Sequence, residues 1–183
     1  VLQRRAGVPL VRHVLNTAAQ LNARSAVVIT GHGADQVEPV VQAPGQALAV
    51  QCVRQEPQLG TGHAVQQAAP VLADDGLVVV LSGDVPLTQA DTLQALIAQC
   101  GGDQLALLTL DMADPTGYGR IVRDGAQVQA IVEHKDATEA QRQIQEVYSG
   151  IMAVPAHLLK GWLGRIDNQN AQGEYYLTDV VAA

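Results

Sequence analysis

The chain has 183 residues, of which 48% are hydrophobic, a size and composition that fit one globular domain and exclude a disordered chain. Its formal net charge of −7, with 11 basic against 18 acidic residues, argues against a nucleic-acid-binding surface. No apolar run approaches the roughly 18 residues of a membrane-spanning helix. We therefore expect neither nucleic acid nor membrane as a partner.

The two cysteines, Cys52 and Cys100, are far apart and have no histidine at metal-ligand spacing. We interpret them as small buried hydrophobes of a protein in a reducing compartment. Since the sequence also shows no signal-peptide pattern, we expect a cytoplasmic protein.

In the first half of the chain, helical and strand patterns alternate. We expect helices at 9–22, 34–42 and 61–72, and a further helix that starts with a capping box at 88–91 and ends at about 100. The strands expected between them cover 25–30, 48–53 and 77–82. The run LVVVLS at 77–82 is the most hydrophobic of these strands. We expect it to be buried on both faces, as in a parallel sheet.

The pattern changes after a further strand at 105–111. Segments 119–123 and 126–134 flank Asp124-Gly125, which predicts a hairpin; a strand at 145–154, a helix at 155–163 and a last helix near Thr178 follow. These elements predict an α/β fold with a mixed, mainly parallel sheet flanked by helices and with an inserted β-hairpin. In such sheets ligands bind beyond the carboxyl ends of the strands.

Two of the loops that follow strands could carry phosphate or metal chemistry. In LSGDVPL (81–87), Asp84 follows a buried strand and could hold Mg²⁺, or it could simply organise the turn before Pro86. In QEPQLGTGHA (55–64), Gly60 and Gly62 free the backbone before a helix N-terminus, which suits an anion or a carbonyl group but also simple helix entry. The segment matches neither a P-loop nor a dinucleotide-binding fingerprint.

Three other segments are open to two interpretations each. The glycines of DPTGYGRI (114–121) could touch a ligand, or Tyr118 could cover the core. The charged strand end IVEHKDA (131–137) could bind a ligand or simply face water. The segment GEYYLTD (173–179) could form a sugar-binding edge, or an aromatic anchor with Thr178 as N-cap. No serine or cysteine lies in a nucleophile-elbow sequence, so nothing supports covalent acyl chemistry.

Taken together, and in this order, several segments resemble one family. QLGTGHA, LSGDVPL, DPTGYGRI, IVEHKDAT, QRQIQE and NAQGEYYLTD are similar to the uridylyltransferase domain of bacterial bifunctional N-acetylglucosamine-1-phosphate uridylyltransferase/glucosamine-1-phosphate acetyltransferase. The resemblance implies a nucleotide-diphospho-sugar transferase fold. It also implies Mg²⁺-dependent transfer of uridylyl from UTP to N-acetylglucosamine 1-phosphate, which gives pyrophosphate and UDP-N-acetylglucosamine, a cell-envelope precursor.

The resemblance also assigns roles to residues of this chain. Gln55, Gly60 and Thr61 would bind the uracil end, and Ser82, Gly83 and Asp84 would line the ribose and phosphates, with Asp84 as the catalytic metal ligand. Gly119, Glu133, Tyr148, Tyr176 and Thr178 would lie at the sugar or its phosphate. Tyr148 stands where the family has an asparagine that contacts the sugar, and a phenol cannot copy an amide's paired donor and acceptor.

The family pattern further implies a single nucleotidyltransferase domain over residues 1–183 that is incomplete at both ends. We expect a Gly-rich phosphate loop before Val1, a metal-binding asparagine beyond Ala183, and a full-length parent that trimerises through an acetyltransferase domain. Two alternatives stay open: another sugar-1-phosphate nucleotidyltransferase, or a non-catalytic module that binds nucleotide sugars.

Overall fold

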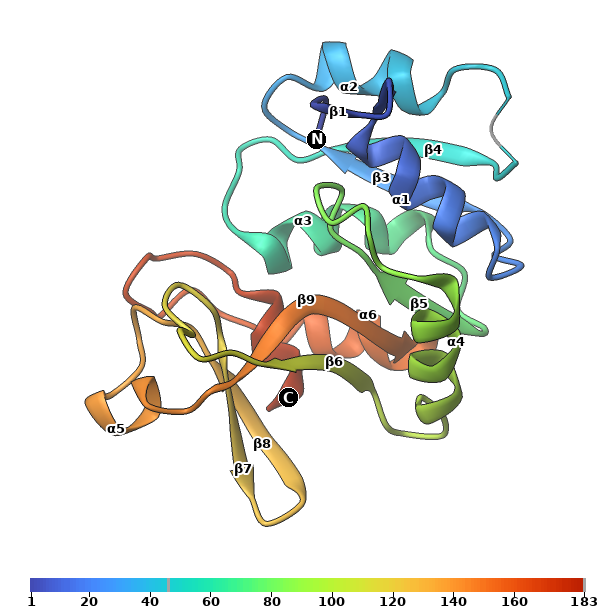
Figure 1. The fold of residues 1–183 in the computed structure, drawn as a ribbon. Helices are drawn as coiled ribbons and strands as arrows, with labels where there is room; N and C mark the ends of the chain where they lie inside the picture. The colour runs from blue at the N-terminus through green and yellow to red at the C-terminus, as the bar shows by residue number, and fades with distance from the viewer. Residues whose placement is uncertain (46, 183) are drawn as a thin grey trace.

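The computed structural model describes residues 1–45 and 47–182, in which helices and strands alternate along most of the chain (Figure 1). The helices are α1 (Leu10–Ala19), α2 (Ala34–Val41), α3 (Thr61–Ala68), α4 (Ala90–Gln99), α5 (Glu139–Arg142) and α6 (Ala156–Leu163), with 3₁₀ helices at Ala69–Val71 and Leu177–Val181. The strands are β1 (Arg4–Arg5), β2 (Val8–Pro9), β3 (Ala26–Thr30), β4 (Val50–Arg54), β5 (Leu77–Val80), β6 (Ala106–Asp111), β7 (Arg120–Asp124), β8 (Gln127–Val132) and β9 (Glu146–Pro155). No helix in these described ranges is long and apolar enough to cross a membrane.

Strands β3 and β4 form a two-stranded parallel sheet, in register from Ala26↔Val50 to Thr30↔Arg54. Helices α1 and α2 bury their apolar stripes against this sheet, where Val11, Leu15, Val37 and Val41 form one core cluster. The α/β alternation expected for this half of the chain is confirmed.

A second sheet has the strand order β5-β9-β7-β8, with β6 also paired to β9. The parallel environment expected for 77–82 is wrong, because β5 pairs antiparallel with β9 in the register Val80↔Met152. The ten-residue β9 is the long central strand of this sheet, and its pairings with β5, β6 and β7 are all antiparallel. Burial of β5 on both faces is wrong as well, since Leu77 is 41% exposed.

The expected hairpin is confirmed as β7–β8, with its turn one residue further along than expected. Asp124 pairs with Gln127, so Gly125 and Ala126 form the turn, and Gly125 adopts a φ of +58°. The hairpin projects from the body of the molecule in Figure 1.

Two expected helix starts differ in the structure. Helix α4 begins after Gln89 without a side-chain cap, so the capping box expected at 88–91 is wrong. A complete capping box instead joins Thr138 and Gln141 at α5. Thr178 lies inside the last, 3₁₀ helix rather than capping it, because its hydroxyl bonds to Glu133.

Candidate functional site

Hydrogen bonds within the loop that leads into α3 stabilise its shape. The Gln55 amide donates to the Gly60 carbonyl at 2.8 Å, and the same nitrogen lies 3.1 Å from Nδ1 of His63. Gly60 precedes α3 with φ +109° and ψ 174°, a backbone conformation that is essentially restricted to glycine. The structure therefore brings together Gln55, Gly60 and Thr61, the three residues expected at the uracil end.

Residues 174–178, which we call the bridging segment, run along this loop. The Gly62 amide donates to the Tyr175 carbonyl at 2.7 Å, and the Tyr175 amide donates to the Leu59 carbonyl at 2.8 Å. Further along the bridging segment, the Leu177 amide donates to the Thr61 hydroxyl oxygen at 3.0 Å. The approach is so close that a Cβ on Gly60 would lie 2.5 Å from the Tyr175 carbonyl oxygen.

The other end of the bridging segment reaches the end of β8. The Thr178 hydroxyl donates to Oε1 of Glu133 at 3.1 Å, and a Cβ on Gly119 would lie 3.5 Å from that same oxygen. The Tyr148 amide donates to the Gly119 carbonyl at 2.9 Å. Residues expected at the sugar end from four separate segments thus meet around one carboxylate.

Burial controls the electrostatics of this end. It raises the pKa of Glu133 above its usual value, although the hydrogen bond from Thr178 acts in the opposite direction. Burial, helped by the nearby charge of Glu133, also holds the pKa of Tyr148 well above its usual value. Tyr148 is 8% exposed and packs in the core with residues such as Met152, and its hydroxyl has no partner among the described residues.

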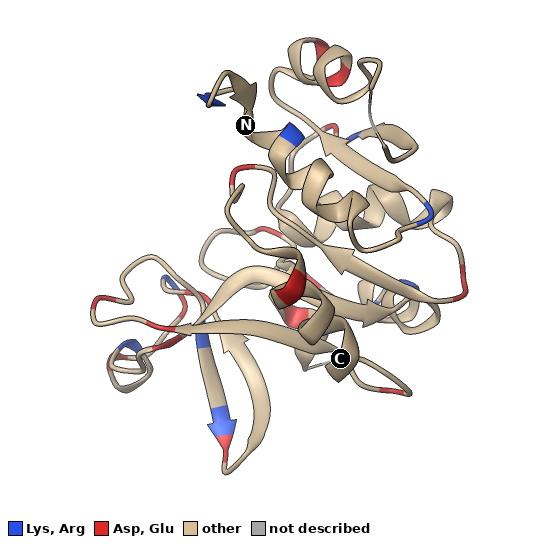
Figure 2. Ribbon diagram, turned by 45° about the vertical axis from the view of Figure 1, so that its right-hand side comes forward, with Lys and Arg blue, Asp and Glu red and all other residues tan. Residues whose placement is uncertain are grey.

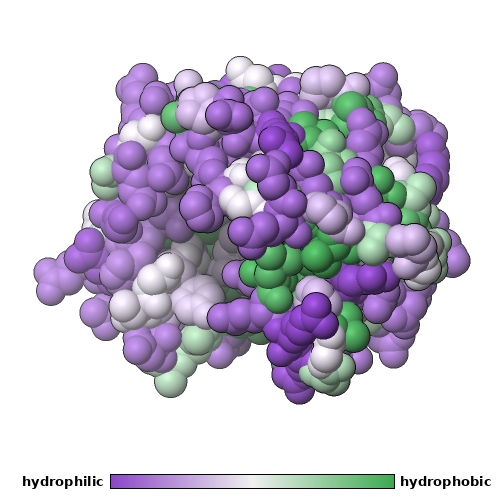
Figure 3. Space-filling model, turned by 90° about the horizontal axis from the view of Figure 1, so that it is seen from above, coloured by the Kyte–Doolittle hydropathy of each residue, from purple (hydrophilic) through white to green (hydrophobic). Residues whose placement is uncertain are grey.

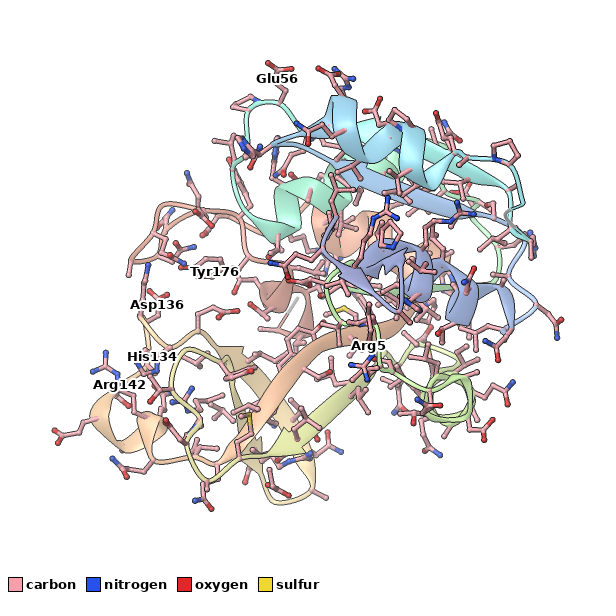
Figure 4. The ribbon with its side chains drawn as sticks, turned by 45° about the horizontal axis from the view of Figure 1, so that its top comes forward. Arg5, Glu56, His134, Asp136, Arg142 and Tyr176 are labelled. Atoms are coloured by element: carbon pink, nitrogen blue, oxygen red, sulfur yellow. The ribbon has the colours of Figure 1, made fainter. Side chains whose placement is uncertain are left out.

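The strand end 133–137 does not simply face water, contrary to the simpler interpretation of the sequence. Asp136 accepts a bond from the Tyr176 hydroxyl at 3.2 Å and another from the Ala171 amide at 2.8 Å. Burial raises the pKa of Tyr176, whose hydroxyl also accepts a bond from Gln172 at 2.9 Å. Figure 4 shows Tyr176 above Asp136, with His134 below them along the same side of the molecule.

A cavity of about 460 Å³ adjoins this strand end. It lies between residues 130–133, which include the end of β8, and the loop 165–170, and Asp136, Tyr176 and Asp179 also line it. Burial, with smaller contributions from neighbouring carboxylates, raises the pKa of Asp179. Asp136 and Asp179 lie in two segments that the sequence left open to two interpretations, and no role was assigned to either residue, since each faces groups supplied by distant parts of the chain.

The turn after β5 stands apart from these contacts. Asp84 is exposed, and its carboxylate has no hydrogen-bond or ion-pair partner within the part of the chain that the structure describes. Ser82 faces β9, because a Cβ on Gly150 would lie 3.1 Å from its Oγ, and Val1 would lie 3.3 Å from a Cβ on Gly83. Across residues 1–45 and 47–182 no group of three or more His, Cys, Asp and Glu side chains could enclose a metal ion.

Two views show how charged and apolar side chains are distributed over the molecule. Figure 2 shows the lysines and arginines dispersed along the ribbon rather than gathered in a stripe. Seen from above, the molecule is hollowed beside a patch of apolar side chains (Figure 3).

Comparison with known proteins places the chain among nucleotidyltransferases. It is 70% identical to the "Bifunctional protein GlmU" of Paracidovorax citrulli over 184 aligned residues and 68% identical to that of Polaromonas naphthalenivorans over 188. These alignments cover 100% and 99% of this chain but 39% and 40% of the relatives, so the chain spans about two fifths of their length.

A solved structure supports the fold. UDP-glucose pyrophosphorylase complexed with UDP-glucose superposes with a TM-score of 0.71 over 95% of this chain and 74% of that chain, at 16% sequence identity. The profile of the MobA-like NTP transferase domain matches residues 1–151, most of the chain. The chain therefore belongs to the MobA-like NTP transferase domain family.

Proposed function

We propose that this chain transfers a uridylyl group from UTP to N-acetylglucosamine 1-phosphate, giving UDP-N-acetylglucosamine and pyrophosphate. The observation that carries the proposal is the bridging segment, which hydrogen-bonds the Gly60–Gly62 loop at one end and Glu133 at the other. Two substrates that react with each other must lie next to each other, and this segment joins the two ends that would hold them. The high identity to the GlmU relatives supports the choice of substrates.

At the nucleotide end, the proposal assigns uracil to Gln55, Gly60 and Thr61. Glycine at 60 lets residues 174–178 pack directly on the loop, and the hydrogen bond from Gln55 to the Gly60 carbonyl holds the loop in shape before a ligand binds. Ser82 and Gly83 would line the ribose and phosphates.

At the sugar end, Glu133 is the residue suited to accept bonds from sugar hydroxyls. It already accepts one from Thr178, and its partial burial strengthens each remaining hydrogen bond. Without a side chain, Gly119 packs against Ile131 and brings its backbone next to that carboxylate, and Tyr176 and Thr178 are buried in the same region. Tyr148 supplies a buried hydroxyl without a described partner, which favours a polar group of the ligand or water next to it.

The proposed reaction needs no nucleophilic side chain. An oxygen of the sugar phosphate attacks the α-phosphorus of UTP, the bond from that phosphorus to the α–β bridging oxygen breaks, and pyrophosphate leaves with the electron pair. The protein contributes alignment of the two substrates and stabilisation of charge. This fits a site built from backbone groups, hydroxyls and an amide, with no activated serine or cysteine.

A divalent metal fits the residues present in one particular way. Asp84 offers a free carboxylate, and no enclosed set of three protein ligands exists among the described residues. Mg²⁺ is commonly held by one or two carboxylates together with substrate phosphates and waters. Bound in this way by Asp84, Mg²⁺ would neutralise phosphate charge on a chain whose own net charge is −7.

The test is a pyrophosphate-release assay on the protein at its natural length. UTP with N-acetylglucosamine 1-phosphate and Mg²⁺ should support turnover, and chelation of the metal should abolish it. Turnover only with a different sugar 1-phosphate or nucleotide would replace the proposed substrates. Binding of UDP-N-acetylglucosamine without any turnover would establish a binding module instead.

Two further parts of the proposal concern the protein in the cell. We place it in the cytoplasm, where UTP is available, which fractionation of its native host would test. The trimer expected for the full-length parent is tested by light scattering of the natural-length protein.

A further inference from the structure

Arg120 is the largest side chain that the described structure buries completely, with 1% exposure. It begins β7 directly after Gly119, and no ion pair with a carboxylate is found for it among the described residues. Its Nε also lacks a hydrogen-bond partner within that part of the chain. The charge of Asp114 acts on the guanidinium without a direct ion pair. A buried guanidinium that no carboxylate pairs with directly is costly, so its position calls for a physical reason.

The bonds that Arg120 makes connect three segments. Nη1 donates to the Tyr118 carbonyl in the turn before Gly119. Nη2 lies 3.2 Å from Nδ1 of His134 and 3.4 Å from the Arg142 carbonyl oxygen, to which it donates. Because a guanidinium has only donors, Nδ1 of His134 is the acceptor in this hydrogen bond.

These partners lie next to the residues proposed to hold the sugar. Tyr118 precedes Gly119, and His134 follows Glu133. A second arginine reinforces the arrangement, since the Arg142 side chain donates from Nε to the His134 carbonyl at 3.4 Å. Figure 4 shows the side chains of His134 and Arg142 close together below Asp136.

We propose that Arg120 is a positioning residue that fixes the Gly119 backbone against the Glu133 carboxylate. The role rests on the proposed function, because it supposes that these two groups bind the acceptor sugar. The planar guanidinium can reach three acceptors in fixed directions, and a lysine ammonium at the same place cannot reproduce that fork. Arg120 therefore acts on sugar binding through its neighbours and does not touch the sugar.

The experiment compares the natural-length protein with three variants. Arg120→Lys keeps the positive charge but loses the planar guanidinium and its set of hydrogen bonds. Arg142→Met removes only the hydrogen bond from the Arg142 side chain to the His134 carbonyl, and it tests the proposal if Arg120→Lys fails to fold. Arg123→Lys is the matched control, because Arg123 lies on the same strand but pairs with Glu146 at 2.7 Å and is partly exposed.

We expect Arg120→Lys to raise the KM for N-acetylglucosamine 1-phosphate about ten-fold, the equivalent of one lost hydrogen bond, with a smaller rise in Arg142→Met. The KM for UTP should stay within about two-fold in all variants, as should both constants in Arg123→Lys. Equal rises in both KM values, or none, would overturn the proposal.

Amide hydrogen exchange separates this proposal from the proposed function. Arg120→Lys should speed exchange in residues 115–119 and 133–142 and leave Val78–Val80 of β5 unchanged. If the unmodified protein shows no uridylyl transfer, the proposed function fails, and this exchange pattern still shows whether Arg120 positions the two segments. Unchanged exchange in both segments would refute the positioning role whatever the activity.

Discussion

Replacing Gly60 by alanine tests how closely the bridging segment is packed on the loop before α3. The native φ of +109° and ψ of 174° lie in a region that costs a non-glycine residue about 1–3 kcal/mol. The added Cβ would also meet the Tyr175 carbonyl oxygen at 2.5 Å, whereas ordinary contacts begin at 3.4 Å. Overpacking of this kind adds about 1–3 kcal/mol, so the expected loss of unfolding free energy is about 2–6 kcal/mol.

Gly33→Ala is the matched control for this substitution. Gly33 also precedes an eight-residue helix and also has a positive φ, of +71°, but nothing lies within 4 Å of a Cβ placed there. Its expected cost is therefore the conformational part only, about 1–2 kcal/mol. Urea denaturation followed by circular dichroism measures both losses, and the two variants losing equal stability would refute the close packing inferred at Gly60.

Three further outcomes follow from the site. Asp84→Asn should lower Mg²⁺-dependent turnover at least about 100-fold without changing the circular dichroism spectrum, and near-normal activity would remove Asp84 from the metal site. Tyr148→Phe removes a buried hydroxyl that has no described partner, so urea denaturation should show unchanged or up to about 1 kcal/mol greater stability; a clear loss would reveal a partner for that hydroxyl. Because burial raises the pKa of Glu133 in the folded state, its contribution to stability is present below its ordinary pKa of 4.5 and is lost as pH rises through the folded-state value. Glu133→Gln should therefore gain stability relative to the unmodified protein as pH rises from 4 to 7, and a pH-independent difference would contradict the raised pKa.

Local patterns in the sequence were sufficient for most of the elements, whereas a family resemblance grouped the residues that the structure brings together at Gly60 and at Glu133. The apolar runs at β3 and β4, and the glycines around Thr61, predicted strands and a helix entry because neighbouring residues determine them. The pairing direction of β5 depends on β9, which follows it by some seventy residues, and no local pattern contains that information.

The same limit applies to the polar residues that the sequence left uncertain. Asp136 looked like a solvated strand end, and its role became visible only when Tyr176 and Ala171 were found against it. No local pattern marks Arg120, at the start of β7, although the fold buries it completely. The metal, uracil and sugar assignments stay predictions, since they depend on ligands that only binding and activity measurements can reveal.

The bridging segment has a thermodynamic consequence for how two ligands would bind. It is bonded to the loop at Thr61 and to Glu133 at the same time, so any ligand that holds it still on one side lowers the ordering cost on the other. Linkage then requires the enhancement to be reciprocal: a given factor gained by the sugar phosphate when UTP is bound is gained by UTP when the sugar phosphate is bound. The ratio of each substrate's affinity with and without the other substrate would measure how strongly the five residues of the bridging segment couple the two ends of the site.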